Sequence, residues 1–421
     1  MSIPGPDDVK RYELSNGLVL LVRQNHASPS VVISGYLPVA ARDEPAEQAG
    51  LSAFTADALS RGTMHRSFSQ IYEAVEAVGA SFGFSSGRHF TGFGAKSLVE
   101  DLPLTLDVLS DVLRNPTFPK NEVEKLRGEI LTDLEERAHD TRDMAGLTFN
   151  TLAYPAAHPH SRSVSGYIET VSALTRDDVV AFYRRGYGPQ GMVLTLVGAV
   201  EPEQALARVE DAFGDWSGAS PVRDPLPPAL PLTEVRREDV AIPGKTQSDL
   251  IMGAPGPART DPHFLDALLC NTILGVFGIM GRLGETVREQ QGLAYYVYSR
   301  VTGGVGPGPW TMIAGVNPAN VERAVESIRA EVRRIQQEPV PADELADNKA
   351  FIVGSLPLRL ETNEGVASAL LDMERYGLGL DYLRRYRGLI EAITPERVQA
   401  AAQRWLDPDA YALAVAGPPR E

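Results

Sequence analysis

Few side chains in this sequence are suited to metal or nucleophile chemistry. The chain has seven histidines, and none of them lies three or four residues from another. Because two zinc ligands on one helix face need that spacing, the histidines predict no zinc-binding helix. The closest pair, His158 and His160, flanks a proline in the loop YPAAHPHSRS, where we expect a surface turn rather than a metal site. The sequence has no Walker loop, dinucleotide fingerprint or G-x-S-x-G motif.

The most specific pattern is the stretch GRLGETVREQQGLAYYVY, from Gly281 to Tyr298. It predicts a helix through Arg288, a C-cap at Gly292 and a strand that starts near Tyr295. From spacing alone, the stretch is a structural corner in which Arg288 is solvated and Tyr295 is half buried.

A weak internal duplication orders the elements around this stretch. Four positions of the first half recur 219 residues later, namely Thr175 with Thr394, Val179 with Val398, Pro189 with Pro408, and Gly198 with Gly417. In both halves they frame a threonine-capped helix with an acidic first turn, a proline stop, and an apolar strand closed by glycine. The sequence therefore predicts two domains of similar topology.

The segment between the halves, SGASPVRDPLPPALPLTEVRRED, contains five prolines. Such a segment forms neither a helix nor a central strand, so we expect a stiff, extended linker. The predicted organisation is a first domain over residues 1–218, a linker over 219–236 and a second domain over 237–421.

Strands and helices occur in blocks within each half. The start, RYELSNGLVLLVRQN, predicts a hairpin around Asn16-Gly17, and VVISGYLPVAAR predicts a strand of the same sheet. Apolar residues at helical spacing predict helices at about 49–60, 67–78, 101–114 and 119–145. The predicted fold class is α+β: two duplicated α/β sandwich domains with helices on one face, packed like a clamshell around a cleft.

The composition excludes several functional classes. With 40 basic and 55 acidic residues, the net charge is −15 and the pI is near 5.0, which disfavours nucleic acid or an anionic membrane as the main partner. The single cysteine, Cys270, allows no internal disulfide or thiolate metal site. We expect a cytoplasmic chain, because it shows neither a secretory signal nor an apolar run of about 18 residues.

The stretch around Arg288 resembles the pitrilysin, insulin-degrading enzyme and mitochondrial processing peptidase family, whose second-half motif is S/G-R-L-x-x-x-x-R-E-x-x-G-L-A-Y. The likeness covers nearly the whole chain. It includes the NGL hairpin, Asp43-Glu44-Pro45, Gly50-Leu51, Gly62-Thr63, Asn115-Pro116, the HPHSR loop and Gly198.

This resemblance implies an inverted zinc motif, His-x-x-Glu-His, between Gly50-Leu51 and Gly62-Thr63. In GLSAFTADALSRGT, however, Ala53 and Asp57 stand where the two histidines belong, and Ala56 stands at the general base. Asp133 falls on or beside the position of the third ligand. Because catalytic zinc sites have three protein ligands, we expect no metal on this chain.

The resemblance also implies a substrate-pairing strand near G-x-x-N-A-x-T, where this chain has Gly83 and Phe84 in place of Asn and Ala. Arg288 and Tyr295, in contrast, match the family pair that holds the substrate carbonyl from the second domain. A guanidinium and a phenol can both donate hydrogen bonds to an oxygen that gains negative charge.

The predicted function is a non-catalytic subunit of a heterodimeric zinc endopeptidase that acts on peptides or unfolded segments. A homologous partner subunit would hold the zinc, and this chain would supply Arg288 and Tyr295. The alternative is a peptide-binding or structural scaffold with no peptidase partner. A stand-alone peptidase would need zinc held without histidines, which ligand chemistry disfavours.

Overall fold

The computed structural model describes residues 3–223 and 225–419, which form two compact units. Each unit combines most of one half of the chain with one or more segments from the other half. Unit 1 comprises Met1–Leu134, Ser163–Pro225 and Pro357–Arg384; unit 2 comprises Glu135–Arg162, Leu226–Leu356 and Arg385–Glu421.

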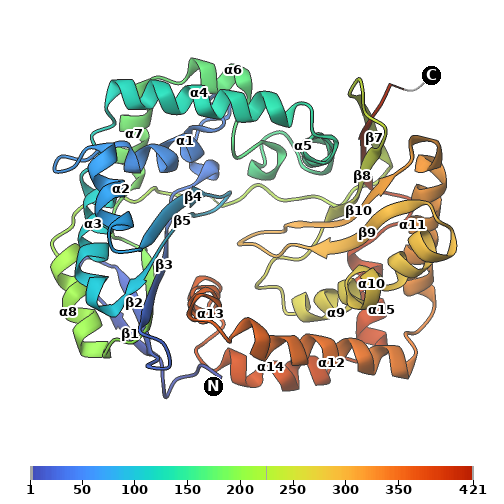
Figure 1. The fold of residues 1–421 in the computed structure, drawn as a ribbon. Helices are drawn as coiled ribbons and strands as arrows, with labels where there is room; N and C mark the ends of the chain where they lie inside the picture. The colour runs from blue at the N-terminus through green and yellow to red at the C-terminus, as the bar shows by residue number, and fades with distance from the viewer. Residues whose placement is uncertain (1–2, 224, 420–421) are drawn as a thin grey trace. The chain divides into compact units, whose positions relative to one another are not determined.

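Unit 1 contains a six-stranded mixed sheet in the order β1-β2-β6-β3-β5-β4 (Figure 1). Its strands are β1 Lys10–Glu13, β2 Val19–Gln24, β3 Ser30–Leu37, β4 Ser81–Ser86, β5 Thr91–Leu98 and β6 Val193–Gly198. β2 runs parallel to β6, and the other neighbouring strands pair antiparallel. The predicted hairpin is present, because β1 pairs with β2 across a turn in which Gly17 has a φ of 85°.

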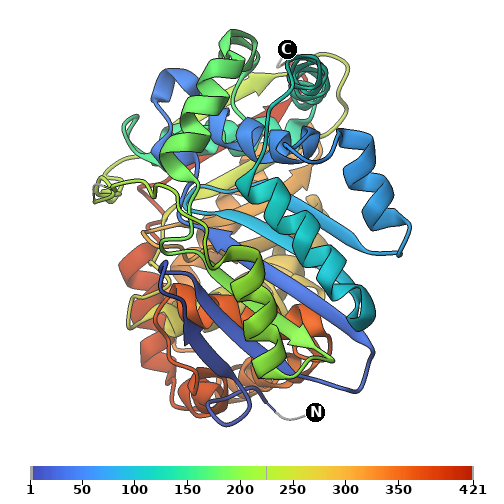
Figure 2. The ribbon, with the colours of Figure 1, turned by 90° about the vertical axis from the view of Figure 1, so that its left-hand side faces the viewer.

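Helices cover both faces of this sheet. In Figure 2, α3 and α8 lie in front of the strands, and in Figure 1 α13 lies on the other side, where it packs against β3 and β6. The helices of this unit are α1 Leu51–Ala58, α2 Phe68–Glu76, α3 Leu102–Arg114, α6 Ile168–Ala173, α7 Arg176–Gly186, α8 Pro202–Phe213 and α13 Asn363–Arg375. The predicted single helical face is thus incomplete, because a helix from the second half covers the other face.

Unit 2 repeats this arrangement around a five-stranded sheet in the order β7-β11-β8-β10-β9. Its strands are β7 Arg236–Ala241, β8 Ser248–Pro255, β9 Ala294–Val301, β10 Pro309–Val316 and β11 Ala412–Gly417. Its helices are α5 Thr141–Ala153, α9 Phe264–Gly275, α10 Phe277–Leu283, the π-helical stretch Gly284–Gln290, α11 Val321–Gln337 and α15 Pro395–Trp405. α5 comes from the first half of the chain and packs against β7, β8 and β11.

Three further helices cross from one unit to the other along the chain. They are α4 Lys120–Arg137, α12 Ala342–Arg359 and α14 Tyr382–Glu391.

The duplication predicted from the sequence is confirmed. The buried strands β6 Val193–Gly198 and β11 Ala412–Gly417 begin 219 residues apart, and each lies inside its sheet. The helices that precede them, α7 and α15, have Thr175 and Thr394 as N-caps, and both side chains accept a hydrogen bond from the backbone N–H three residues later. The helices that cross to the opposite unit, α5 and α13, also occupy equivalent places in the two halves.

One predicted helix is wrong in its extent. The pattern at 119–145 predicts a single helix, but the chain forms α4 and α5 with a break at 138–140. The Asp140 side chain accepts a hydrogen bond from the backbone N–H of Asp143, so it caps a new helix at this point. Helical periodicity continues through such a break, which explains why the pattern does not reveal it.

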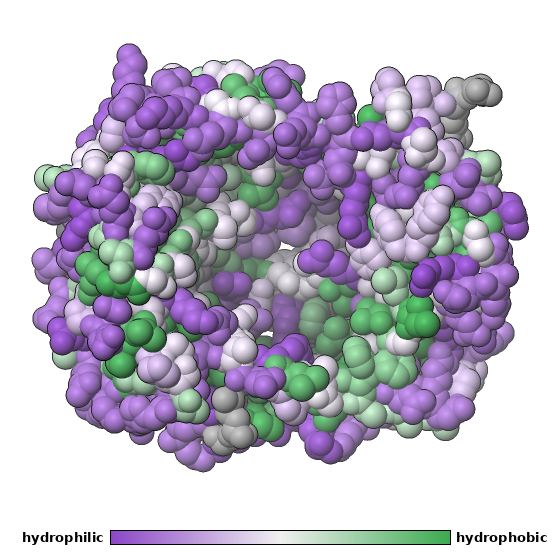
Figure 3. Space-filling model, in the orientation of Figure 1, coloured by the Kyte–Doolittle hydropathy of each residue, from purple (hydrophilic) through white to green (hydrophobic). Residues whose placement is uncertain are grey.

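The remaining features concern the linker and the surface. Residues 216–223 and 225–235 form neither helix nor strand. Hydrophilic residues cover most of the face shown in Figure 3, with apolar residues in smaller groups between them. Across residues 3–223 and 225–419, no single helix is long and apolar enough to cross a membrane. Only α9 taken with Phe277–Gln290 reaches that length and hydropathy, and this pair bends by 90°.

Candidate functional site

The three altered motif positions share one face of α1 in unit 1. Ala53, Ala56 and Asp57 are three and four residues apart, which places them on the same side of a helix. Ala56 is fully buried, Ala53 is partly buried and Asp57 is exposed. The two alanines offer no lone pair to a metal or a water molecule, so Asp57 is the only acid–base group on this face.

The N-terminus of α1 is held by a buried carboxylate. Glu44, which is 5% exposed, accepts hydrogen bonds from the backbone N–H groups of Gly50 and Ser52 at 3.1 and 2.7 Å. A carboxylate at this end satisfies unpaired N–H groups and interacts favourably with the helix dipole. The Ser52 hydroxyl also lies 2.6 Å from the Ser86 hydroxyl, which connects α1 to the edge strand β4.

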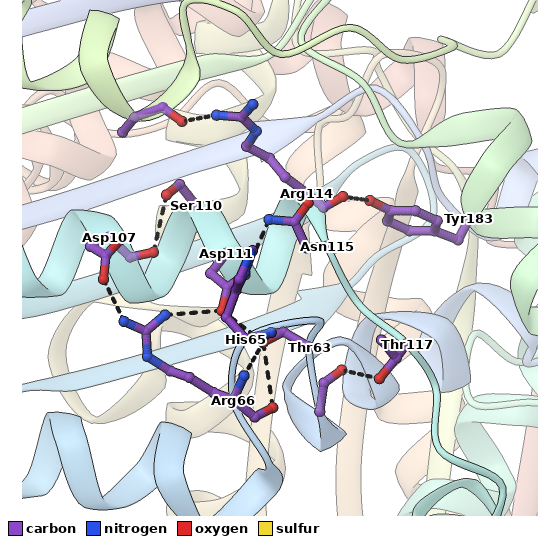
Figure 4. Close-up of polar contacts among 12 residues, drawn as sticks. Thr63, His65, Arg66, Asp107, Ser110, Asp111, Arg114, Asn115, Thr117 and Tyr183 are labelled. Atoms are coloured by element: carbon purple, nitrogen blue, oxygen red, sulfur yellow. Dashed lines mark hydrogen bonds and ion pairs between the residues drawn. The ribbon is translucent and has the colours of Figure 1, made fainter.

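The loop after α1 is held by Asp111 on α3 (Figure 4). This buried carboxylate accepts hydrogen bonds from Thr63 Oγ1 at 2.7 Å, Arg66 Nη1 at 3.0 Å and Asn115 Nδ2 at 3.1 Å, and His65 Nδ1 lies 2.7 Å away. Burial by itself raises the pKa of the Asp111 carboxyl, but these four partners outweigh it and hold the pKa below its ordinary value. The helix that carries the altered motif is therefore fixed at both ends.

A cluster of carboxylates lies beside Asp57. Burial by neighbouring atoms raises the pKa of Asp57 to about 6 although the residue as a whole is exposed; nearby Arg61 lowers it, and Asp133 and Glu129 raise it. Arg61 donates two hydrogen bonds to the Glu129 carboxylate, one of them at 3.2 Å, and this pairing lowers the pKa of Glu129. The Arg61 guanidinium also lies 5.1 Å from the centre of the Phe68 ring.

This donor set does not fit a catalytic zinc ion. Such an ion needs three protein ligands, and the carboxylates available beside Asp57 are Asp133 and Glu129, the second of which is already paired with Arg61. The guanidinium of Arg61 brings a positive charge to the same cluster, and this charge disfavours a cation there. Over the described part of the chain, no group of three or more His, Cys, Asp or Glu side chains is placed to hold a metal ion.

The predicted substrate-pairing strand is β4, which lies at the edge of the unit 1 sheet. Gly83 is exposed on it, and the Phe84 ring packs edge-on against Phe82 with ring centres 5.9 Å apart. An edge strand has unpaired backbone N–H and C=O groups that another strand can pair with. β4 is thus an edge strand, and its pairing with a substrate stays a prediction.

The predicted corner around Arg288 is present in unit 2. The π-helical stretch Gly284–Gln290 contains Arg288, Gly292 follows with a φ of 62°, and β9 begins at Ala294. Tyr295 is 65% exposed, and 39% of the Arg288 side chain is exposed, with an ion pair to Glu289 at 3.3 Å. A structural corner predicts a half-buried tyrosine, so the exposure of Tyr295 favours the alternative in which its hydroxyl meets a ligand.

A buried network that the sequence does not reveal holds β9 from its other face. Asp249 on β8 is 3% exposed and accepts hydrogen bonds from the Tyr296 hydroxyl and from Thr141 Oγ1 of α5. Arg142 lies 5.0 and 5.6 Å from the ring centres of Tyr296 and Tyr298 and donates to the Tyr298 hydroxyl at 2.6 Å. Burial, and the hydrogen bond to Asp249, raise the pKa of Tyr296. Because side chains alternate along a strand, this network fixes β9 while Tyr295 remains exposed.

The prediction for His158 and His160 is wrong in one respect. The HPH segment forms a turn at Pro159–Ser161, but His158 is fully buried and His160 is 5% exposed, so the turn does not lie on the surface. Both imidazoles pack against the Tyr154 ring with ring centres 4.8 and 4.9 Å apart. Polarity and a proline favour exposure in a sequence, but aromatic packing overrides that tendency here.

The chain is similar in sequence to proteins of one peptidase family. The model of the insulinase family, peptidase family M16, matches residues 19–160, and the model of the peptidase M16 inactive domain matches residues 173–351. An uncharacterized zinc protease of Streptomyces coelicolor is 30% identical over 408 residues, which cover 95% of this chain and 87% of that protein. Subunit 1 of the human mitochondrial cytochrome b-c1 complex is 27% identical over 62% of this chain and 54% of its own length.

A similar fold occurs in a solved structure described as a peptidase M16 inactive domain from Pseudomonas fluorescens. It has a TM-score of 0.90 and covers 98% of each chain at 23% identity. The two family models together span most of the chain, and the Streptomyces relative spans nearly all of it. The chain therefore belongs to peptidase family M16, the insulinase family.

Proposed function

We propose that this chain is a non-catalytic subunit of a heterodimeric zinc endopeptidase that acts on peptides or unfolded segments. A homologous partner subunit holds the zinc, and this chain supplies Arg288 and Tyr295 to the partner's site. The observation that carries the proposal is the exposure of Tyr295, at 65%, on a strand fixed by the buried Asp249 network.

The chemistry of the two side chains suits this role. When a peptide carbonyl is attacked, its oxygen gains negative charge, and preorganised donors stabilise that charge. The Arg288 guanidinium and the Tyr295 hydroxyl are such donors, and neither has to leave a buried site to reach a ligand.

The α1 region supports the other half of the proposal. Ala53 and Ala56 cannot bind metal or accept a proton, and the carboxylates near Asp57 are balanced by Arg61. We infer that the zinc-binding motif has been lost, so the chain alone cannot activate a water molecule in the way that an inverted zinc motif does.

The second candidate is a peptide-binding or structural scaffold with no peptidase partner. The likeness to subunit 1 of the human cytochrome b-c1 complex favours it, because that relative is named as a subunit of a larger complex and not as a peptidase. A scaffold needs no exposed pair of hydrogen-bond donors, so we place this candidate second.

The test is reconstitution. The chain is purified from its native host with any associated subunit, and zinc content and peptide hydrolysis are measured for the complex and for each chain alone. For this chain alone, we expect well under one zinc per molecule and no peptide hydrolysis. For the complex, we expect both bound zinc and peptide hydrolysis. Chelator-sensitive, stoichiometric zinc on the isolated chain would refute the proposal. A complex whose partner has no peptidase activity would favour the scaffold.

The proposed place of action is the cytoplasm. With a single, buried cysteine the chain forms no internal disulfide, the bond that stabilises many proteins of oxidising compartments. The acidic surface makes neither nucleic acid nor a membrane a proposed partner.

A further inference from the structure

The proline-rich segment between the two halves of the chain has a backbone of one kind. Residues 225–235 form neither helix nor strand, and in Figure 1 they belong to the extended yellow-green trace that leads into β7. The prolines at 225, 227, 228 and 231 fix their own φ at about −65°. A residue that precedes a proline is in turn confined to extended backbone. We therefore describe residues 226–232 as a polyproline II helix, which has three residues per turn.

Every third residue of this helix packs against unit 2. Leu226, Ala229 and Leu232 lie on one face, because they are three residues apart. Leu232 is 8% exposed and belongs to the apolar core of unit 2, and Ala229 packs against the same core. Leu226 lies over Gly306, where an added Cβ would approach Leu226 Cδ1 to 2.7 Å. This face fixes the segment to unit 2, so it is not available to a partner.

The other two faces of the helix are accessible. Pro228 and Pro231 lie on the second face, and both are exposed. Pro227 and Leu230 lie on the third face, where Pro227 is partly exposed and Leu230 is 61% exposed. A cavity of about 510 Å³ in unit 2 borders Pro231, so there is open space beside this end of the segment. Burial along residues 226–232 thus follows the three-residue period of the helix.

This pattern of burial indicates which kind of protein can bind the exposed side. Protein modules that recognise a polyproline II helix bind it in a groove lined by aromatic side chains. Such a groove takes up two of the three faces of the helix, and the third face points away. In the run PPALP at residues 227–231, the two exposed faces are free for a groove, and the face of Ala229 is the one that packs on unit 2. This packing also holds the run in its extended conformation, so less conformational entropy is lost on binding.

We propose that residues 227–231 are a docking site for a protein module with an aromatic-lined groove that binds polyproline II helices. The aromatic rings of the module pack on Pro228 and Pro231, and Leu230 enters the same groove. The run carries no charge, and the uncharged Pro225 and Thr233 lie two residues from its ends. Apolar contact rather than ion pairing therefore holds the module, and salt should not weaken the binding. This docking uses neither residue of the Arg288 corner and stands independently of the proposed function.

The experiment measures binding of the full chain to three purified modules, an SH3, a WW and an EVH1 domain, by biolayer interferometry. We expect at least one module to bind, with a dissociation constant that changes less than about twofold between low and high salt. The same module with its groove aromatic residues replaced by alanine should not bind. The proposal is overturned if no module binds, if the groove variant binds equally well, or if high salt abolishes binding. It is also overturned if a module binds a synthetic peptide of residues 225–233 but not the full chain.

A pair of double variants of the chain locates the binding. We expect Pro228→Ala with Pro231→Ala to weaken binding of the module at least about tenfold, because both prolines of one recognised face are lost. The matched control is Pro339→Ala with Pro341→Ala, two exposed prolines of unit 2 that lie outside the segment. Leu230→Ala should also weaken binding and keep the wild-type melting temperature, since this side chain is exposed. Equal loss in the two double variants would show non-specific adhesion and would overturn the proposal.

Discussion

The α1 region of unit 1 and the β9 corner of unit 2 are anchored in the same way but carry different side chains at the positions of the predicted site. Both are held by a buried carboxylate that accepts several hydrogen bonds, Asp111 below the loop after α1 and Asp249 behind β9. On the supported surface of α1, however, two alanines stand at motif positions, whereas the corner presents Arg288 and Tyr295 to solvent.

This difference separates what positions a site from what performs its chemistry. Removing either buried carboxylate lowers the free energy of unfolding, because its hydrogen-bond donors lose their partner. This loss does not depend on whether the neighbouring exposed side chains have a function. The presence of a buried anchor is therefore weak support for an activity. The exposed side chains determine whether the site can perform chemistry. Substitutions at the two regions should accordingly divide into those that change stability and those that change rate.

The largest effect should come from the corner. We expect Arg288→Ala and Tyr295→Phe each to lower turnover of the reconstituted complex about 100-fold, or roughly 3 kcal/mol, because each removes a donor to the developing oxyanion. Melting temperature should change little, since Tyr295 is exposed and the Arg288 side chain is partly exposed. Steady-state kinetics and thermal unfolding on the same proteins check this.

The matched control is Arg300→Ala, an exposed arginine on β9, the strand that carries Tyr295. If Arg300→Ala lowers turnover as much as Arg288→Ala, the effect is one of general charge and the corner has no special role. A complex that keeps full rate with both Arg288 and Tyr295 replaced would end the hypothesis.

The α1 anchor should show the opposite behaviour. We expect Asp111→Asn to lower the free energy of unfolding by about 2 kcal/mol, because it leaves Thr63 and Arg66 donors facing an amide in a buried site. Turnover of the folded complex should remain near the wild-type value. Chemical denaturation measures the first quantity, and Asp107→Asn on the same helix, with 61% of its side chain exposed, is the control that should cost little.

The stability that Asp111 contributes depends on pH in a definite direction. The pKa of Asp111 is lowered below its ordinary 3.8 in the folded chain, so its contribution is complete above that value and is lost as the pH falls through the folded pKa. The gap between wild type and Asp111→Asn should thus be constant from neutral to mildly acidic pH and narrow only at lower pH. A gap that narrows at neutral pH would contradict this assignment.

The β9 anchor should give a smaller effect of the same kind. Tyr296→Phe removes one of several donors to Asp249 and should lower the free energy of unfolding by about 1 kcal/mol. Tyr295→Phe, one residue away but exposed, should leave stability unchanged. Equal losses in these neighbours would mean that the two faces of β9 do not differ as the structure indicates.

Sequence reasoning recovers the elements whose signals are local. The capping residues Thr175 and Thr394, the turn at Gly17 and the glycine after the Arg288 helix are each specified within a few residues, and all are present. The break before α5 is missed because one capping aspartate, Asp140, outweighs a periodicity that runs through it.

Features that join distant segments leave no local signal. Nothing in the sequence links Arg61 to Glu129, or Asp249 to Thr141, since their contacts depend on tertiary packing. The same holds for α5 and α13, each of which covers a sheet built mainly from the other half of the chain. The motif residues of the candidate site could be located from the family resemblance, but their anchors required the structure.

The smallest effect concerns the one ionisable residue of the altered α1 face. The pKa of Asp57 is raised from 3.8 to about 6, so the folded state binds its proton more tightly than the unfolded state does. Stability should therefore fall as the pH rises from about 4 to about 6, and the loss should be complete above 6. An amide side chain does not titrate in this range, so Asp57→Asn should match wild type near pH 4 and be more stable at pH 7 to 8. Because the residue is exposed, solvent screening reduces the gain to about 0.5 kcal/mol. Denaturant midpoints measured across this range, with Asp177→Asn as a 95% exposed control, decide the point. If the stability difference between Asp57→Asn and wild type does not vary with pH, the ionised Asp57 carboxylate does not destabilise α1, and Arg61 compensates for its charge fully.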